Sequence, residues 1–135
     1  MPVVVAAHPK SEYCGTEFKG RKIIKYRTNE LVSNSDLVII HSSNSISYAM
    51  LANKPTIFIT TNGLNSIKNF NLRIKNLART FNKKAYNIDQ DSFDKYDFSC
   101  VESNCRKEYI YTYLTSTETD KIKNIDILDS FFKSV

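Results

Sequence analysis

The sequence is poor in the residues that loosen or interrupt a fold. It has only three glycines and three prolines among 135 residues, which disfavours disordered, collagen-like and low-complexity classes. No apolar run approaches the roughly 18 residues that a membrane-spanning helix needs, and no basic stretch or cleavage site at the start indicates a signal peptide. With 41% hydrophobic residues, the chain is expected to form a single domain over residues 1–135 with its own core.

Cysteine is also scarce. The three cysteines, Cys14, Cys100 and Cys105, are too few for a disulfide framework and wrongly spaced for a four-ligand zinc site. We therefore expect reduced thiols in a cytoplasmic protein, with a bridge between Cys100 and Cys105 as the alternative. No metal or other cofactor is predicted.

Negative charge is missing from the middle of the chain. Residues 1–36 carry six basic and four acidic side chains, residues 37–88 carry seven basic and none acidic, and residues 89–135 carry six basic and ten acidic. The net charge of +5 conceals this asymmetry. An acid-free stretch suggests a surface that meets an anion, such as a nucleotide diphosphate, a nucleic acid or an anionic lipid. A solvated helix face is the alternative explanation.

Short apolar runs alternate with segments of helical periodicity. This order predicts βαβ units and an α/β fold, a Rossmann-like open parallel sheet with helices on both faces. The run 3–7 is expected to be buried on both sides, and Asn62-Gly63 is expected to form a turn. The expected strands are 3–7, 23–24, 37–40, 56–60 and 86–88, and the expected helices are 28–35, a segment from Ser42 or Ser43 to Asn53, 67–81, 102–113 and 122–132.

Polar residues follow two of the expected strands. Ligands of open parallel sheets bind beyond the carboxyl ends of the strands, where His8-Pro9 and His41-Ser42-Ser43 are placed. Two hydroxyls at the start of a helix offer O–H and backbone N–H donors to a phosphate, and His8 can donate a hydrogen bond or a proton. The plainer alternatives are that the serines only cap the helix and that His8 packs against a loop.

Several nucleotide and hydrolase motifs are missing. The sequence has no G-x-G-x-x-G or G-x-x-x-x-G-K-[ST] loop, which disfavours dinucleotide dehydrogenases and P-loop NTPases. It has no G-x-S-x-G elbow either, which argues against an α/β-hydrolase.

A succession of motifs over about half of the chain resembles a known family. The motifs are Ala-Ala-His8-Pro9-Lys10, the segment from Thr28 to Ile46 with its His41-Ser42-Ser43, and Asn53-Lys54-Pro55 followed by the run 56–60. Together they resemble the C-terminal, donor-binding domain of GT-B glycosyltransferases of bacterial capsule and surface polysaccharide synthesis. They are also similar to bacterial sialyltransferases and teichoic-acid polymerases.

The resemblance implies a nucleotide-activated sugar as the ligand and specific roles for residues. His8 and Pro9 would approach the donor phosphate, with His8 as the catalytic acid, and Ser42 and Ser43 would bind that phosphate. Thr28 and Glu30 would lie near the nucleotide. The candidate donor-binding residues are His8, Pro9, Thr28, Glu30, His41, Ser42, Ser43 and Ser45.

Two departures from the family qualify these expectations. Many GT-B enzymes hold the ribose with a glutamate where Tyr48 stands here, which favours a CMP- or CDP-activated donor over a UDP-activated one. The N-terminal acceptor domain of these enzymes is expected to be absent, so we expect the chain to be inactive alone.

The alternative function is a polyanion-binding module. The basic residues beyond position 66 could bind nucleic acid or hold the protein against the inner face of an acidic membrane. No aromatic platform or known docking motif accompanies them, which makes nucleic acid the less favoured partner. The cluster consists of Lys68, Arg73, Lys75, Arg79, Lys83 and Lys84.

Overall fold

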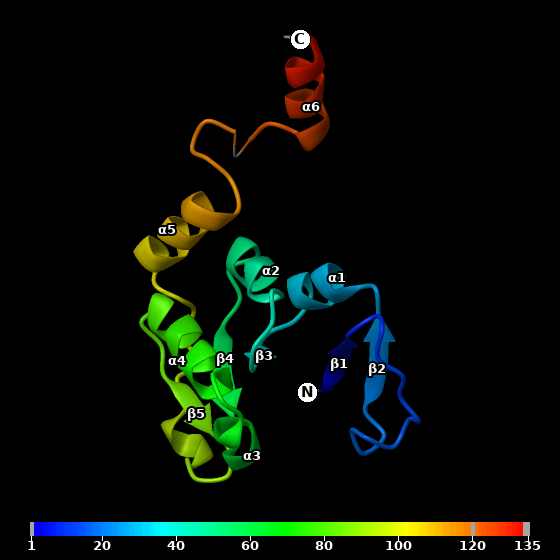
Figure 1. The fold of residues 1–135 in the computed structure, drawn as a ribbon, viewed down its shortest axis with the longest axis vertical. Coiled ribbons are helices and arrows are strands. Elements are labelled where there is room, and N and C mark those ends of the chain that lie inside the picture. The colour runs from blue at the N-terminus through cyan, green and yellow to red at the C-terminus, as the bar shows by residue number, and fades with distance from the viewer. Residues whose placement is uncertain (1, 120, 134–135) are drawn as a thin grey trace.

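The computed structural model describes residues 2–119 and 121–133. Between residues 22 and 87 each strand is followed by one or two helices, and every strand pair among the described residues is parallel, so the predicted α/β class is confirmed. The strands are divided between two small sheets, one of two strands and one of three (Figure 1). This arrangement is compatible with a Rossmann-like fold, although the sheets are small.

The smaller sheet pairs β1 (Val4–Ala7) with β2 (Lys22–Lys25), with Val4 opposite Lys22. The expectation that the first strand is buried on both faces is wrong. Ala7 is buried, whereas Val4 remains 41% exposed. The reason is that this sheet has only two strands, so few neighbouring side chains can cover it.

The larger sheet has the order β3-β4-β5 and contains the central strand of the fold. Its strands are β3 (Val38–Ile40), β4 (Thr56–Thr60) and β5 (Ala85–Asn87). Phe58 pairs with Ile40 on one side and with Ala85 on the other. Because β4 has a strand on each side and helices packed nearby, four of its five residues are buried, as its uninterrupted β-branched and aromatic sequence predicts.

Helix α2 (Ile46–Leu51) contacts two other helices. These are α1 (Thr28–Ser33) and α5 (Ser103–Tyr113). Figure 1 shows them as a row across one end of the strands. Helix α1 begins at Thr28, and its N-cap, Arg27, makes no capping bond through its side chain.

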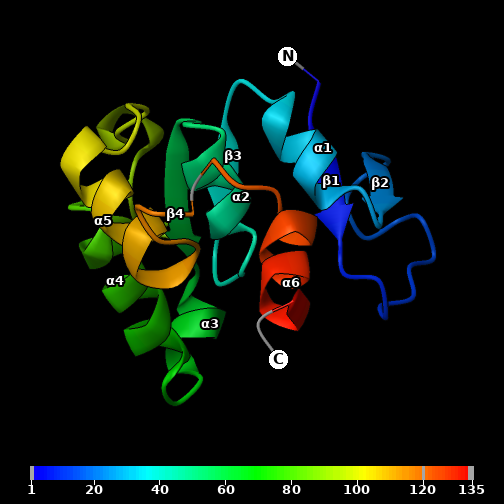
Figure 2. The ribbon, with the colours of Figure 1, turned by 90° about the horizontal axis from the view of Figure 1, so that it is seen from above.

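Two helices follow β4, where we expected a turn and then one long helix. Helix α3 (Asn62–Ser66) begins at the expected turn because the Thr61 hydroxyl accepts a hydrogen bond from the Leu64 amide at 3.0 Å. Helix α4 (Phe70–Thr80) begins three residues later than predicted, after Asn69 adopts a left-handed conformation with φ of 70°. Both helices lie on the same side of the strands, opposite α1 (Figure 2).

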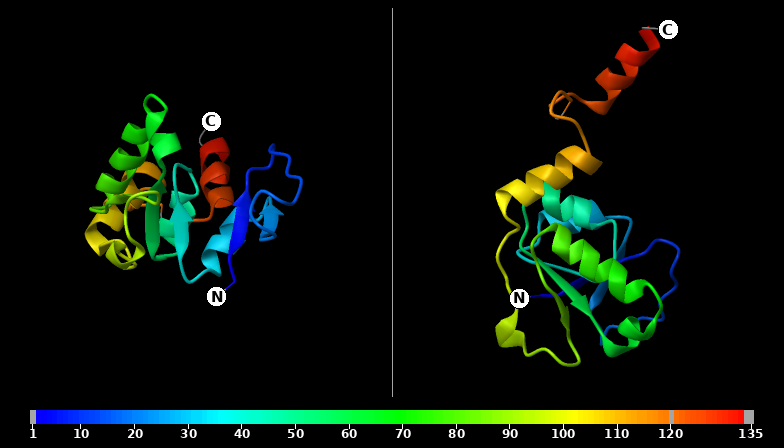
Figure 3. Two further views of the ribbon diagram at one scale, coloured as in Figure 1. Left: turned by 90° about the horizontal axis from the view of Figure 1, so that it is seen from below. Right: turned by 60° about the vertical axis from the view of Figure 1, so that its left-hand side comes forward.

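The remaining elements follow β5. A 3₁₀ turn, η1 (Phe93–Lys95), precedes α5. Helix α6 (Asn124–Lys133) comes after a loop and projects away from the sheets (Figure 3). The predicted helices 102–113 and 122–132 are therefore confirmed to within two residues.

The core lies between the larger sheet, α2, α4 and α5. Phe58 from β4 stacks on Phe81, which follows α4, with ring centroids 5.9 Å apart, and Phe81 contacts Tyr109 of α5 at 4.9 Å. Ile74 of α4 and Met50 of α2 are fully buried beside them. These contacts hold the helices that form the walls of the site.

Candidate functional site

A hollow of about 1230 Å³ opens where β1, β2 and β3 end. His8 follows β1, Tyr26 follows β2 and Ser42 follows β3, and all three line this hollow. The structure therefore brings together the carboxyl ends of strands from both sheets, the position at which parallel sheets bind ligands. Of the expected donor-binding residues, five line the hollow: His8, Thr28, Ser42, Ser43 and Ser45.

The serines belong to a bent loop, not to the helix start predicted from the sequence. Helix α2 begins at Ile46, and its N-cap Ser45 makes no capping bond with its side chain. The Ser43 hydroxyl accepts a hydrogen bond from the Ser45 amide at 3.1 Å and donates one to the Ser45 hydroxyl at 2.8 Å. Ser45 Oγ can then donate its own proton to a ligand. Ser42 Oγ has no bond to the residues described, so it is a second available donor.

His8 is held by the loop that follows β1. The Lys10 amide donates a hydrogen bond to His8 Nδ1 at 3.2 Å. A neutral imidazole that accepts at Nδ1 carries its proton on Nε2, so Nε2 is the atom that can donate to a phosphate oxygen. For His8 to act as an acid, Nδ1 would also have to gain a proton, which would break the bond from Lys10.

Helix α4 forms a second wall of the hollow. Arg73, Asn76 and Thr80, three and four residues apart, line the hollow from one face of this helix. Arg73 has no ion pair with the described part of the chain. Among the described lining residues there is no Asp or Glu. The hollow therefore presents an unneutralised guanidinium and several hydroxyl and amide groups, a combination suited to an anion.

Aromatic rings from α5 and α2 complete the lining. Tyr109 and Tyr113 lie one turn apart on α5 with ring centroids 5.2 Å apart. The Tyr109 hydroxyl lies 3.1 Å from the Ser47 hydroxyl, which links α5 to α2. Tyr113 remains 68% exposed, and Tyr48 also faces the hollow. Exposed aromatic rings beside an anion-binding surface can stack with a nucleobase.

Three of the expected donor-binding residues do not line the hollow: Pro9, Glu30 and His41. Glu30 pairs with Arg27, which donates from Nε to Glu30 Oε2 at 2.7 Å. This hydrogen bond lowers the pKa of Glu30 and directs its carboxylate to Arg27. His41 instead stacks on Phe70 of α4, with ring centroids 5.9 Å apart.

Sequence reasoning missed the α4 and α5 walls of the hollow. The sequence places Arg73 only in the basic cluster, because its charge is evident from the sequence whereas the direction of its side chain depends on how α4 packs. A partial signal was present in the spacing of Arg73, Asn76 and Thr80, which places all three on one helix face. Tyr109 and Tyr113 show the same spacing of one turn.

Other chemistry in the described residues is limited. No group of three or more His, Cys, Asp or Glu among them could hold a metal ion. Cys14, Cys100 and Cys105 are unpaired, and Cys100 instead lies 3.5 Å from the carbonyl of Asn53. Within the described ranges, no helix has the length and apolarity to cross a membrane.

Comparisons with family models, with curated proteins and with solved structures each return no match to this chain. The fold class thus rests on the structure, and the candidate site rests on the geometry of the hollow.

Proposed function

We propose that the hollow binds the phosphate of a nucleotide-activated sugar, and that the chain is the donor-binding domain of a GT-B type glycosyltransferase for capsular or surface polysaccharide. The observation that carries the proposal is that His8, Ser45 and Arg73 all line one hollow at the carboxyl ends of parallel strands. All three offer donors to an anion, and the described lining has no carboxylate to oppose it.

The hollow has room for both the phosphate and the base. His8 Nε2, Ser45 Oγ and the Arg73 guanidinium would contact phosphate oxygens. The α5 tyrosines would stack with the base. Tyr48 stands where related enzymes use a glutamate to hold the ribose, so a CMP- or CDP-activated donor is preferred to a UDP-activated one.

Sugar transfer would draw on charge stabilisation at the leaving phosphate. Donors already aimed at this group stabilise the negative charge that develops as the glycosidic bond breaks. His8 could also protonate the leaving nucleotide if it releases the Lys10 amide. Turnover further requires the acceptor-binding domain that the resemblance implies, so nucleotide binding is the property to measure in this chain.

The test is calorimetric titration of the chain with CMP, CDP and UDP. We expect saturable binding, tightest for a cytidine nucleotide. His8→Ala and Arg73→Gln should each weaken it by about 1–3 kcal/mol, because a hydrogen bond to a charged group is lost. His41→Ala is the matched control, since it removes the other histidine, which stacks on Phe70 outside the hollow.

Unchanged affinity in both His8→Ala and Arg73→Gln would exclude the hollow as the phosphate site. An equal loss in His41→Ala would place the nucleotide elsewhere. Sugar transfer by the chain alone would contradict the need for an acceptor domain.

A further inference from the structure

Helix α4 has a third face that neither the core nor the hollow uses. Its core face carries Ile74 and Ala78, which are buried, and its hollow face carries Arg73 and Thr80. The opposite face carries exposed residues at spacings of three and four, which places them in one row. These residues are Leu72, Lys75 and Arg79.

An exposed turn leads into the start of α4. Ile67 and Lys68 lie in the turn that joins α3 to α4, and both are exposed. Side chains on a helix tilt towards its N-terminus, so Leu72 leans towards this turn. We call the five residues the outer stripe: Ile67, Lys68, Leu72, Lys75 and Arg79.

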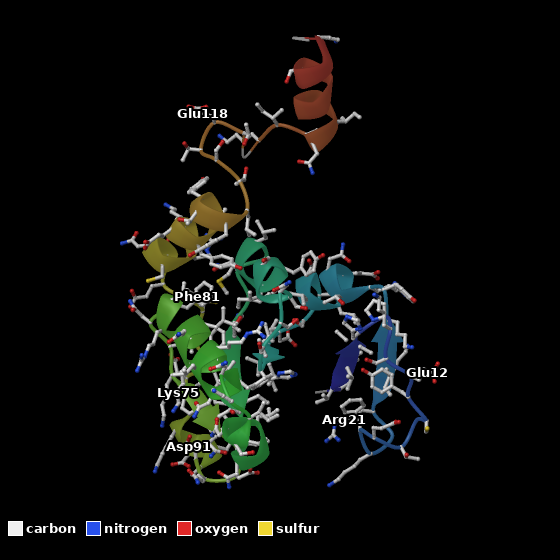
Figure 4. The ribbon with its side chains drawn as sticks, in the orientation of Figure 1. Glu12, Arg21, Lys75, Phe81, Asp91 and Glu118 are labelled. Carbon is white, nitrogen blue, oxygen red and sulfur yellow. The ribbon has the colours of Figure 1, made fainter. Side chains whose placement is uncertain are left out.

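The outer stripe combines uncompensated positive charge with exposed apolar side chains. Its three cations form no salt bridge with any described residue. Leu72 is 61% exposed and Ile67 is 53% exposed. Figure 4 shows Lys75 on the outer side of α4, away from the sheet.

Two lysines of the basic cluster are paired with acidic residues. Lys83 lies 2.5 Å from Asp97, and Lys84 lies 3.2 Å from Asp91. Their charges are therefore neutralised locally, which leaves the free positive charge of this region on Arg73, inside the hollow, and on the outer stripe.

We propose that the outer stripe docks on an anionic lipid surface. Its cations would lie at the level of the headgroups, and Leu72 and Ile67 would enter the boundary with the acyl chains. Charge complementarity selects an anionic partner, and the two exposed aliphatic residues favour a lipid over a nucleic acid. Surfaces that bind single-stranded nucleic acid commonly add flat aromatic side chains to the cations, and the outer stripe has none. This proposal does not depend on what the hollow binds.

The experiment is vesicle sedimentation with phosphatidylcholine alone and with added phosphatidylglycerol. The chain should bind only the anionic vesicles, less tightly as salt is raised. Lys75→Gln combined with Arg79→Gln should lower the partition coefficient by roughly 30-fold, since each basic residue near the surface contributes roughly fivefold. Leu72→Ser should also weaken binding, because it removes an apolar insertion without changing the charge.

The matched control is Lys22→Gln combined with Lys107→Gln. It removes the same two charges from exposed positions on β2 and α5, and it should leave vesicle binding nearly unchanged. Circular dichroism of each variant checks that it is folded, and nucleotide titration checks that the hollow is intact.

Three results would overturn the proposal. One is the absence of binding to anionic vesicles. Another is an equal loss in the control pair, which would show a response to net charge alone. The third is that single-stranded RNA binds more tightly than the vesicles and that Leu72→Ser leaves vesicle binding unaffected, which would identify a nucleic-acid surface.

Discussion

Lys83 is a basic residue whose charge is buried and neutralised by an acidic partner. Its side chain is only 7% exposed, and its ammonium donates to Asp97 at 2.5 Å and to the Ser99 hydroxyl and carbonyl. These bonds tie the end of α4 to the loop that leads to α5. The hydrogen bond from Lys83 is also the main reason why the pKa of Asp97 falls from 3.8 to about 2.

This pair predicts a specific acid sensitivity. A folded-state pKa below the unfolded one means that the bond stabilises the protein fully above about pH 4, and that this contribution is lost as the pH falls towards 2. Because Asp97 is half exposed, we expect the bond to contribute only about 1 kcal/mol to the free energy of unfolding. Urea unfolding as a function of pH should show a smaller loss across this window in Asp97→Asn than in the parent chain. An identical pH dependence would contradict the prediction.

For single residues, the sequence shows which residues come near the ends of strands, but it does not show in which direction their side chains point. His8 and Ser42 are predicted to lie just beyond strands, and both do, because each comes shortly after an apolar run that forms a strand. His41 was placed with them, yet it stacks on Phe70. The choice between these directions depends on packing against α4, which is distant in sequence.

At the level of elements, two helices end in the same way. After α2, the amides of Asn53 and Lys54 donate to the carbonyls of Met50 and Ala49. After α4, Asn82 and Lys83 repeat this pattern towards Arg79 and Ala78. Both asparagines adopt left-handed backbones, with φ of 49° for Asn53 and 52° for Asn82. Each helix is thus closed by a Schellman motif.

The left-handed backbone of Asn53 predicts that two substitutions at this position change the stability of the protein in different directions. Asn53→Gly should maintain or raise stability, because glycine adopts a left-handed backbone without steric cost. Asn53→Val should lower the free energy of unfolding by about 1–2 kcal/mol, because a β-branched residue is strained there. Urea denaturation of both variants measures the difference. Equal stability of the two would show that the backbone at this position does not limit the fold.

Element predictions succeeded where local patterns decide the outcome. The strand 56–60 matches β4 because five consecutive β-branched and aromatic residues favour an extended, buried segment. The expected turn at Asn62-Gly63 is wrong because the Thr61 side chain caps a short helix there. The helix expected from residue 67 starts at Phe70 because apolar periodicity continues through the left-handed Asn69 and does not reveal it.

At the scale of the whole molecule, the two sheets differ in how well they are supported. β4 has a strand on each side and lies in the core, whereas β1 and β2, among the residues that the structure describes, pair only with each other. A two-stranded sheet is marginal without further packing. The hollow joins both parts, since His8 directly follows β1 of the smaller sheet and Ser45 lies in the loop that follows β3 of the larger sheet.

Hydrogen exchange should reveal this difference. We expect the amides of β1 and β2 to exchange faster than those of β4, because local opening requires fewer buried contacts to be lost. A nucleotide that contacts both His8 and Ser45 should slow exchange in β1 and β2. Exchange measured by mass spectrometry with and without CDP tests both expectations. Uniform protection across the two sheets would contradict the first, and an unchanged rate in β1 with bound CDP would contradict the second.

The residues of helix α4 lie in three different environments: the core, the hollow and the outer stripe. Since one residue turns a helix by about 100°, a one-residue deletion near Leu72 would rotate the following side chains out of all three. Ile74 would leave the interior and Arg73 would leave the hollow in the same step. The length of this helix is thus constrained more tightly than the identity of any one exposed residue, because a substitution changes one face whereas a deletion or insertion displaces all three.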